Sequence, residues 1–374
     1  MKNLADKISR RKFLTGLGTT IAGCALARGV PVLAAEGAEL HEASFYEPLA
    51  GKKVRCTLCP RRCVVSDVQR GYCGVRENRN GKYYTLVYGR PCAMHMDPVE
   101  KKPFFHVYPG SKAFSIATVG CNIECKFCQN WDISQANPDD VTTAYYSPEQ
   151  IARMAKQSKA RTIAYTYSEP TIFYEYLRDC AKAGLDQGIE SIMVSNGFIS
   201  AQAQKELFPI LKAIKIDLKA FTQSFYTDIC DGYLQPVLDT LKRLRDSGVW
   251  YEIVVLLIPT LNDSEDEIKR MTEWIVKELG IDVPVHFSRY HPMYKIRNIP
   301  PTPVKTLHRA RQIALENGCH FVYIGNVPVK DAQYTFCPSC KAVLIRRYGY
   351  RILENAIENG KCKFCGAKIP GVWI

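Results

Sequence analysis

Runs of apolar and β-branched residues recur along the chain from residue 114 onward, and polar stretches separate them. Short continuous apolar runs of this kind are typical of strands that are buried on both faces. The runs occupy residues 114–120, 162–168, 191–197, 214–220, 251–259, 283–290 and 321–327. The pattern therefore predicts six or seven strands between residues 114 and 327.

Most of the stretches between these runs carry helix signals. Ser147 can cap a helix whose first position is Pro148. Acidic residues at 263–267 favour another helix start, because carboxylates stabilise the positive end of a helix, and Gly280 predicts its end. Strands that alternate with helices predict a parallel sheet with helices covering its outside.

We therefore expect an α/β fold with a partial TIM-like (β/α)6 barrel, whose chemistry lies at the C-terminal ends of the strands. An open flavodoxin-like sheet would show the same alternation, but the Gly-rich fingerprint of a dinucleotide site is absent from the sequence. Changes in composition divide the chain into four parts. They are a leader at 1–34, a cysteine-rich module at 35–112, the barrel at 113–330 and a second cysteine module at 331–374.

The leader resembles a twin-arginine export signal. Arg10 and Arg11 precede a weakly apolar stretch that is too short to span a bilayer as a permanent helix, so we expect no transmembrane helix. Processing would follow Ala34, or would occur at the lipobox-like segment that ends at Cys24.

The chain carries a formal net charge of +13. Residues 1–34 contribute six basic residues and one acid, so +8 remains without them. This excess favours an anionic substrate or partner, although a scattered basic surface is the commoner explanation. Because no compact basic run with interleaved aromatic residues occurs, nucleic acid is not indicated.

Sixteen cysteines change this picture, because eleven of them form three groups. The groups are Cys56, Cys59, Cys63 and Cys73; Cys121, Cys125 and Cys128; and Cys337, Cys340, Cys362 and Cys365. In a chain this long, closely spaced cysteines indicate metal sites before disulfides. The other five are scattered, and isolated cysteines are usually small buried hydrophobic residues.

The first and last groups each supply four thiolates. The last group has two C-x2-C pairs about twenty residues apart, which is typical of a zinc ribbon, and the metal would supply much of the folding energy of so short a segment. The first group can close a zinc site or hold an auxiliary iron–sulfur cluster, and its spacing does not decide between them. Disulfides formed after export are a third alternative for the first group.

The central group packs three thiols into eight residues directly after the first apolar run. Three such thiolates can hold three corners of an iron–sulfur cube. Since the segment has no fourth cysteine, one iron would stay open for another ligand. Structural thiols or part of a zinc site are the alternatives, but zinc ligands normally come in pairs.

Polar residues stand at the ends of the later predicted strands, where charged groups need a partner or a polar cavity. Lys215, Asp217 and Lys219 alternate along one strand and therefore share a face. The candidate binding residues are Glu169, Ser195, Asn196, Asp217, Lys219 and His291. Carboxylates and cations in one pocket suit a zwitterionic ligand, whose amine and carboxylate they would bind.

The C-x3-C-x2-C spacing, with Phe127 before the last cysteine, closely resembles the motif of the radical S-adenosylmethionine (SAM) superfamily. Residues 114–300 are similar to the activating enzymes of glycyl-radical enzymes, of which the pyruvate formate-lyase activase is the type. Glu169 and Pro170 match the Gly-Gly-Glu-Pro of that family, but Tyr167 and Ser168 replace its glycines.

Other segments refine the resemblance. Asp217-Leu218-Lys219 matches the family's Asp-Leu-Lys, whereas Val194 takes the place of an acid before Ser195. The chain also resembles the radical SAM member of the AmmeMemoRadiSam group. Three segments carry this resemblance: the first cysteine group, the loop at residues 97–103 and the C-terminal cysteine pairs. That resemblance covers residues 50–374.

The resemblance implies a radical SAM oxidoreductase that is similar to the activases. The central cysteines would hold a [4Fe–4S] cluster that cleaves SAM reductively, and the resulting 5′-deoxyadenosyl radical would take a hydrogen atom from an unidentified substrate. The strand-end residues would orient SAM, with His291 near SAM or substrate. An electron donor such as flavodoxin or ferredoxin is implied, as is a protein substrate or partner from the AmmeMemoRadiSam group.

Two questions stay open at this point. The cysteine groups alone also allow a non-enzymatic iron–sulfur/zinc redox or partner-docking protein. The leader suggests export or membrane association, whereas the supply of SAM and of reductant favours the cytoplasm.

Overall fold

The computed structural model describes residues 40–373. The predicted leader at 1–34 and its two processing sites lie outside the described residues. No helix within the described range combines the length and the apolar character needed to cross a membrane.

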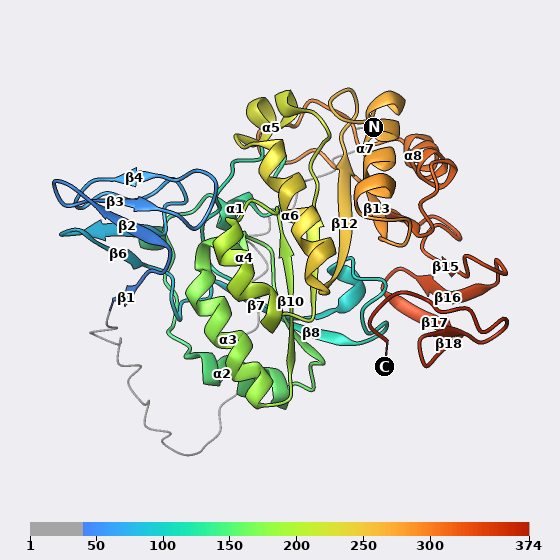
Figure 1. The fold of residues 1–374 in the computed structure, drawn as a ribbon, viewed down its shortest axis with the longest axis horizontal. Helices are drawn as coiled ribbons and strands as arrows, with labels where there is room; N and C mark the ends of the chain where they lie inside the picture. Colours follow the sequence, from blue (N-terminus) through green and yellow to red (C-terminus); the bar gives the residue numbers. More distant parts are fainter. Residues whose placement is uncertain (1–39, 374) are drawn as a thin grey trace, which may run out of the picture. The chain divides into compact units, whose positions relative to one another are not determined.

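An eight-stranded sheet forms the centre of the structure (Figure 1). Its strand order is β14-β13-β12-β11-β10-β9-β8-β7. Strands β8 to β14 are parallel, and β7 pairs with β8 in the antiparallel sense at the edge. The strands are β7 (Ala93–Pro98), β8 (Lys112–Ala117), β9 (Thr162–Tyr165), β10 (Glu190–Ser195), β11 (Ala213–Asp217), β12 (Trp250–Leu257), β13 (Val285–Arg289) and β14 (Val322–Gly325).

All seven strands predicted from the apolar runs are confirmed, and so is the α/β fold with a partial barrel. The sheet begins at β14 and ends at β7, so it does not close on itself. Prolines in the segment around β7 argue against a helix or a central strand, and β7 is an edge strand. It lies in the segment that the sequence assigned to the first cysteine module, and it pairs with β8 along its whole length.

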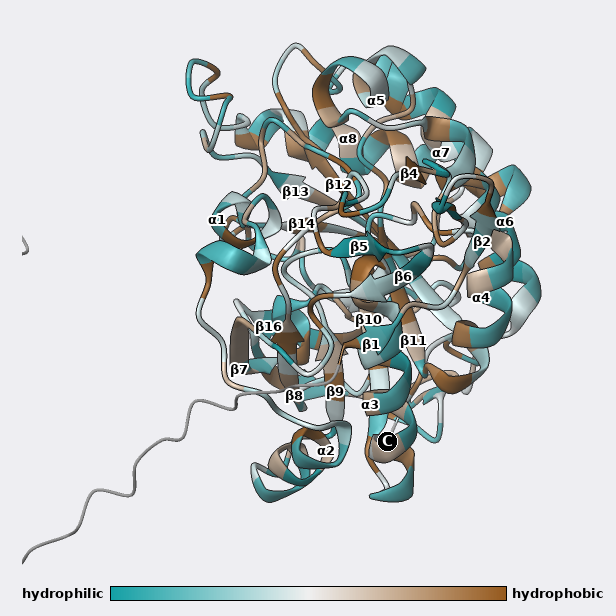
Figure 2. Cartoon of the chain, turned by 90° about the vertical axis from the view of Figure 1, so that its left-hand side faces the viewer, coloured by the Kyte–Doolittle hydropathy of each residue, from teal (hydrophilic) through white to brown (hydrophobic). Residues whose placement is uncertain are grey.

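Helices connect the parallel strands. They are α1 (Trp131–Ser134), α2 (Pro148–Gln157), α3 (Tyr174–Asp186), α4 (Ala201–Leu207), α5 (Gln223–Cys230), α6 (Leu234–Ser247), α7 (Glu265–Glu278) and α8 (Val304–Glu316). As predicted, Ser147 caps α2, and Gln150 completes a capping box. Ser264 caps α7, whose first turn carries three acids. In Figure 2, α2, α3 and α6 carry hydrophilic residues beside hydrophobic ones, which suits helices that cover a sheet.

Short strands build the two cysteine-rich modules. The first module has a sheet of β1 (His41–Glu42), β6 (Lys82–Thr85) and β5 (Arg76–Arg79), and a sheet of β2 (Tyr46–Leu49), β3 (Lys53–Cys56) and β4 (Val64–Val65). The second has a sheet of β15 (Thr335–Phe336), β16 (Val343–Tyr348) and β17 (Arg351–Asn355), and a pair of β18 (Ile357–Glu358) and β19 (Lys361–Cys362). In Figure 1 these modules lie on opposite sides of the large sheet.

Buried polar contacts attach both modules to the barrel. Arg76 in β5 forms an ion pair with Glu175 in α3, with nitrogen–oxygen distances of 2.8 and 2.5 Å and both side chains almost fully buried. Arg347 in β16 donates to the carbonyl oxygen of Phe105 at 2.7 Å, and the backbone nitrogen of Phe105 donates to Glu252 in β12 at 3.0 Å. Removing either partner would leave an unpaired buried charge at a cost of about 3–5 kcal/mol, so the first module and α3 each supply a charge that the other needs.

Candidate active site

A cavity of about 430 Å³ lies at the C-terminal ends of the parallel strands. Small-molecule sites are typically about 300–1,000 Å³, so the cavity has the size of a ligand site. Residues that are far apart in the sequence line it, among them Cys121, Cys125, Cys128, Glu169, Ser195, Asn196, Lys215, Asp217 and Lys219. The structure thus brings the central cysteines together with five of the six predicted strand-end residues.

His291 is the residue that the structure does not bring there. Its side chain is exposed, and it is not among the residues that line the cavity. The predicted contact of His291 with a ligand therefore stays a prediction without geometric support.

The loop that carries the central cysteines follows β8 and is held against α5. The backbone nitrogen of Glu124 donates to the carbonyl oxygen of Cys230 at 2.8 Å, and that of Lys126 donates to the carbonyl oxygen of Ile229 at 2.9 Å. Cys125 is buried, and Cys121 and Cys128 are partly buried. The Cys128 sulfur lies 3.3 Å from the Ser134 hydroxyl oxygen. The loop therefore presents its three thiols to the cavity from a fixed backbone.

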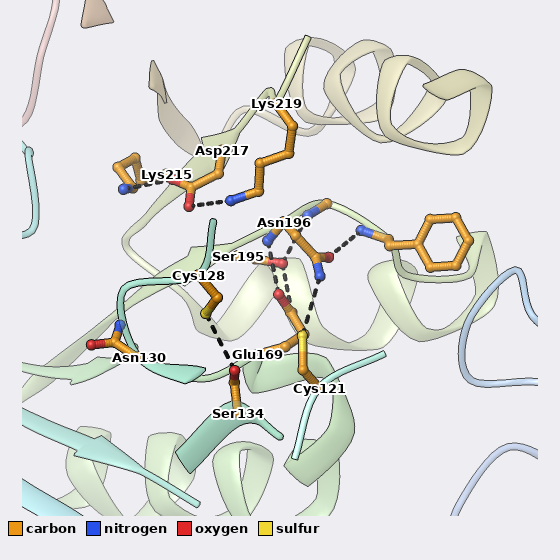
Figure 3. Close-up of polar contacts among 12 residues, drawn as sticks. Cys121, Cys128, Asn130, Ser134, Glu169, Ser195, Asn196, Lys215, Asp217 and Lys219 are labelled. Atoms are coloured by element: carbon orange, nitrogen blue, oxygen red, sulfur yellow. Dashed lines mark hydrogen bonds and ion pairs between the residues drawn. The ribbon is translucent and has the colours of Figure 1, made fainter. Parts of the chain in front are cut away.

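Glu169 organises one wall of the cavity (Figure 3). Its buried carboxylate accepts hydrogen bonds from the Ser195 hydroxyl at 2.7 Å, the Asn196 backbone nitrogen at 2.8 Å and the Thr171 hydroxyl at 2.7 Å. Burial raises the pKa of Glu169, and these donors oppose that shift. The side-chain amide of Asn196 donates to the Asn122 side-chain oxygen at 2.8 Å, which joins this wall to the cysteine loop.

Asp217 lies between two lysines on the opposite wall (Figure 3). The ammonium nitrogens of Lys215 and Lys219 are 2.7 and 2.9 Å from its two carboxylate oxygens. Burial disfavours the charged form of Asp217, but the two lysines outweigh it and hold its pKa well below the usual range. Two cations share one carboxylate here, so this wall retains a positive charge for an anionic group. The prediction that the three charges share a face is confirmed.

A second aspartate, Asp97 at the end of β7, pairs with two lysines in the turn that follows, and the local sequence gives no sign that these lysines line the cavity. Asp97 accepts from Lys101 at 2.8 Å and from Lys102 at 2.6 Å, and it also accepts from the Tyr167 hydroxyl. Both lysines and Tyr167 line the cavity. Burial lowers the pKa of Lys102 to about 8 against the opposing effect of Asp97.

Tyr167 has a backbone conformation that tyrosine rarely adopts. Its φ is +68°, in the left-handed region that favours glycine. The cost of such a residue is about 1–2 kcal/mol. Contacts offset this cost, because Asn130 donates to the Tyr167 carbonyl oxygen at 2.9 Å and the Lys102 ammonium lies 3.9 Å from the ring centre. Local sequence signals give no indication of these long-range contacts.

The C-terminal cysteines converge on one point. The sulfurs of Cys337 and Cys365 are 3.6 Å apart, and those of Cys340 and Cys362 are 3.7 Å apart. All four sulfurs lie within 4.8 Å of one another. Four sulfurs at about 2.3 Å from one metal ion would have this separation, so the group can hold a single tetrahedral ion.

The N-terminal cysteines surround a separate, smaller cavity. Cys56, Cys59, Cys63 and Cys73 line it together with two arginines, Arg61 and Arg76. Asn122, Thr171 and Ile172, which belong to the barrel, also line it.

Comparisons with known proteins agree with this arrangement. The sequence pattern of the family described as "Radical SAM superfamily" matches residues 115–275. An uncharacterized protein of Methanocaldococcus jannaschii is 42% identical over 332 residues, which cover 88% of this chain and 99% of that protein. A pyruvate formate-lyase-activating enzyme of Clostridium pasteurianum is 24% identical over 193 residues, which cover 48% of this chain and 80% of that enzyme.

Solved structures resemble parts of the chain. A domain of a pyruvate-formate lyase-activating enzyme from Bacteroides vulgatus matches with a TM-score of 0.40 and 21% identity. The match covers 44% of this chain and 99% of that domain.

Proposed function

The chain is an enzyme of the radical SAM superfamily related to the glycyl-radical activating enzymes, and on that premise we propose that it cleaves SAM reductively within the cavity at the strand ends. Cys121, Cys125 and Cys128 would hold the [4Fe–4S] cluster. The observation that carries the proposal is that these three thiols share one cavity with a buried carboxylate and a lysine–aspartate–lysine array.

The residues present suit both groups. Thiolates are the protein ligands of iron–sulfur clusters, and three of them leave one iron of a cube for an external ligand. Across the cavity, Glu169 and the Lys215–Asp217–Lys219 array offer acceptors for an amine and cations for a carboxylate. The cluster, when bound, would supply the electron that breaks a carbon–sulfur bond of SAM, which is chemistry of the cofactor and not of the side chains.

The side chains would position SAM. The carboxylate of Glu169 is fixed by Ser195, Thr171 and the Asn196 backbone, so it stays in place as a SAM amine approaches. Lys219 and Lys215 share the single charge of Asp217, so a carboxylate of the ligand would meet an incompletely neutralised pair of ammonium groups. The fixed positions of these groups would bring the reacting bond to the open iron.

The substrate would reach the cavity past Lys101, Lys102 and Tyr350, which also line it. Similarity to activating enzymes makes a backbone glycine of a partner protein one candidate for the hydrogen donor. A small molecule or another macromolecule is the alternative, because Tyr167 and Ser168 replace glycines next to the predicted SAM site. Incubation with a glycyl-radical protein from the same organism, followed by EPR of a glycyl radical, distinguishes these candidates.

SAM binding to the cluster is tested by EPR spectroscopy. The protein is reconstituted with iron and sulfide without oxygen, reduced with dithionite and measured with and without SAM. We expect SAM to change the signal of the reduced cluster in the wild type, because SAM would occupy the open iron. An unchanged spectrum at saturating SAM would contradict the proposal.

A further inference from the structure

The N-terminal cysteines form a site that the proposed SAM chemistry does not use. Four sulfurs, from Cys56, Cys59, Cys63 and Cys73, line one cavity. Cys56 is buried and the other three are partly buried. Four thiolates around one cavity are a complete ligand set for a metal centre, with no position left for a substrate.

The spacing of these sulfurs differs from that of the C-terminal group. In the C-terminal group, all four sulfurs lie within 4.8 Å of one another. Among residues 40–373, no other group of three or more cysteine, histidine or acidic side chains has its ligand atoms this close together. The N-terminal four and the central three do not converge in this way. A single zinc ion needs converged sulfurs at about 2.3 Å from the metal. An iron–sulfur cube holds its thiolates farther apart, because its own iron and sulfide atoms lie between them.

Two arginines lie at this cavity. Arg76 is buried in its ion pair with Glu175, and Arg61 donates to the carbonyl oxygen of Asn122 at 2.5 Å. Cations beside a cluster offset the negative charge of four thiolates and of the sulfides they surround. Glu175 and Asp231 pair with these arginines, so the arginines offset only part of that charge, and the four thiols are the main support for a cluster.

Two pairs of hydrogen-bonded residues separate this cavity from the proposed SAM cavity. Asn122 and Thr171 line the N-terminal cavity, and their hydrogen-bond partners Asn196 and Glu169 line the SAM cavity. At Gly120, the backbone of the cysteine loop comes close to the first module. A side chain at Gly120 would come within 2.8 Å of the Cys73 carbonyl oxygen, and its φ of +99° also favours glycine.

We propose that Cys56, Cys59, Cys63 and Cys73 hold a second [4Fe–4S] cluster, fully ligated by protein and adjacent to the SAM cavity. Because all four irons would carry a protein thiolate, this cluster would not bind SAM. The second cluster is inferred from the N-terminal residues alone. That the cavity beside it binds SAM rests on the proposed function.

Metal analysis of two complementary variants tests this inference. Both are reconstituted as full-length chains with iron and sulfide under anaerobic conditions. One carries Cys121→Ala, Cys125→Ala and Cys128→Ala, and the other carries alanine at Cys56, Cys59, Cys63 and Cys73. We expect each variant to retain about four irons, and the wild type to hold about eight. The reduced central-triple variant should give an EPR signal that SAM leaves unchanged.

Iron near zero in the central-triple variant, with zinc or no metal in its place, would overturn the inference. If that variant does not fold, the metal content of the wild type provides the test. About four irons and about two zincs per wild-type chain would also overturn the inference of a second cluster. Failure of the proposed function looks different. In that case the central-triple variant still holds iron, but SAM does not change the EPR signal of the wild type.

Discussion

The side-chain nitrogen of Asn196 lies 3.9 Å from the sulfur of Cys121 (Figure 3). This contact joins the end of β10 to the cysteine loop that follows β8. The same nitrogen donates to the side-chain oxygen of Asn122, so its direction is fixed. Hydrogen bonds to the sulfurs of a cluster are among the features that set its reduction potential.

Replacing this donor should shift the potential of the cluster. In the variant Asn196→Leu, the Cys121 sulfur loses an N–H neighbour that favours the more negative, reduced state. We expect a more negative midpoint in an EPR-monitored redox titration without SAM. The matched control is Asn130→Leu, since the side chain of Asn130 donates to a carbonyl oxygen and not to a sulfur. Equal midpoints for Asn196→Leu and the wild type would contradict this role.

Lys102 should give the folded protein a pH-dependent stability. Its pKa is about 8 in the folded state, whereas an unfolded chain keeps the proton of a lysine to about pH 10.4. Between these values the unfolded state binds more protons, so stability rises with pH, by up to about 3 kcal/mol. Urea unfolding at pH 7.5 and pH 10 should show this gain in the wild type and its loss in Lys102→Met.

The control for this experiment is Lys101→Met. Lys101 pairs with the same carboxylate of Asp97, but its side chain is 46% exposed, whereas that of Lys102 is 3% exposed. We expect Lys101→Met to keep the gain between pH 7.5 and pH 10. A gain that persists in Lys102→Met would show that Lys102 is not its source.

Asp217→Asn should destabilise the protein and weaken SAM binding, because Asp217 holds the two ammonium groups in the positions where they would receive the SAM carboxylate. The change leaves the ammonium groups of Lys215 and Lys219 facing each other without a counterion. Breaking a fully buried ion pair costs about 3–5 kcal/mol. The Asp217 side chain is 29% exposed toward the cavity, so we expect a smaller loss, about 1–3 kcal/mol. Denaturant unfolding measures the loss, and equilibrium dialysis with labelled SAM measures the affinity.

The comparison for Asp217 is Asp282→Asn, which removes a half-exposed partner of His320. An exposed pair of this kind contributes about 0–1 kcal/mol. If the two variants lose equal stability and bind SAM equally well, the lysine–aspartate–lysine array has no special role.

The C-terminal cysteines should hold zinc. We expect Cys340→Ser to reduce zinc by about one ion per chain and to leave iron unchanged. The melting temperature should fall, because the metal supplies folding energy to a short module. Cys319→Ala, a buried cysteine outside the three groups, serves as the control and should keep its zinc. Unchanged zinc in Cys340→Ser would show that the metal is held elsewhere.

The elements that could be predicted from the sequence are those that local patterns determine. Each apolar run from residue 114 onward became a parallel strand, and Ser147 with Pro148 began a helix, because burial and capping act over a few residues. The strand order of a parallel barrel then places the strand ends together. Glu169, Ser195, Asn196, Asp217 and Lys219 were found for that reason.

Other features depend on contacts between distant segments, which no local pattern records. The segment with Asp97 and Lys102 meets Tyr167 only after β7 pairs with β8. The approach of Gly120 to Cys73 depends on how the first module packs on the barrel. His291 follows a predicted strand and was therefore expected at the ligand site, but its side chain is exposed.

The central claim is that the three thiols of the strand-end cavity support reductive cleavage of SAM. The most direct measurement is the formation of 5′-deoxyadenosine and methionine after anaerobic reconstitution and reduction with dithionite. We expect equal amounts of both products from the wild type and from the control Cys319→Ala, and neither product above background from Cys125→Ala. Wild-type protein that holds its full iron content but forms no 5′-deoxyadenosine, or an unimpaired Cys125→Ala variant, would contradict the account.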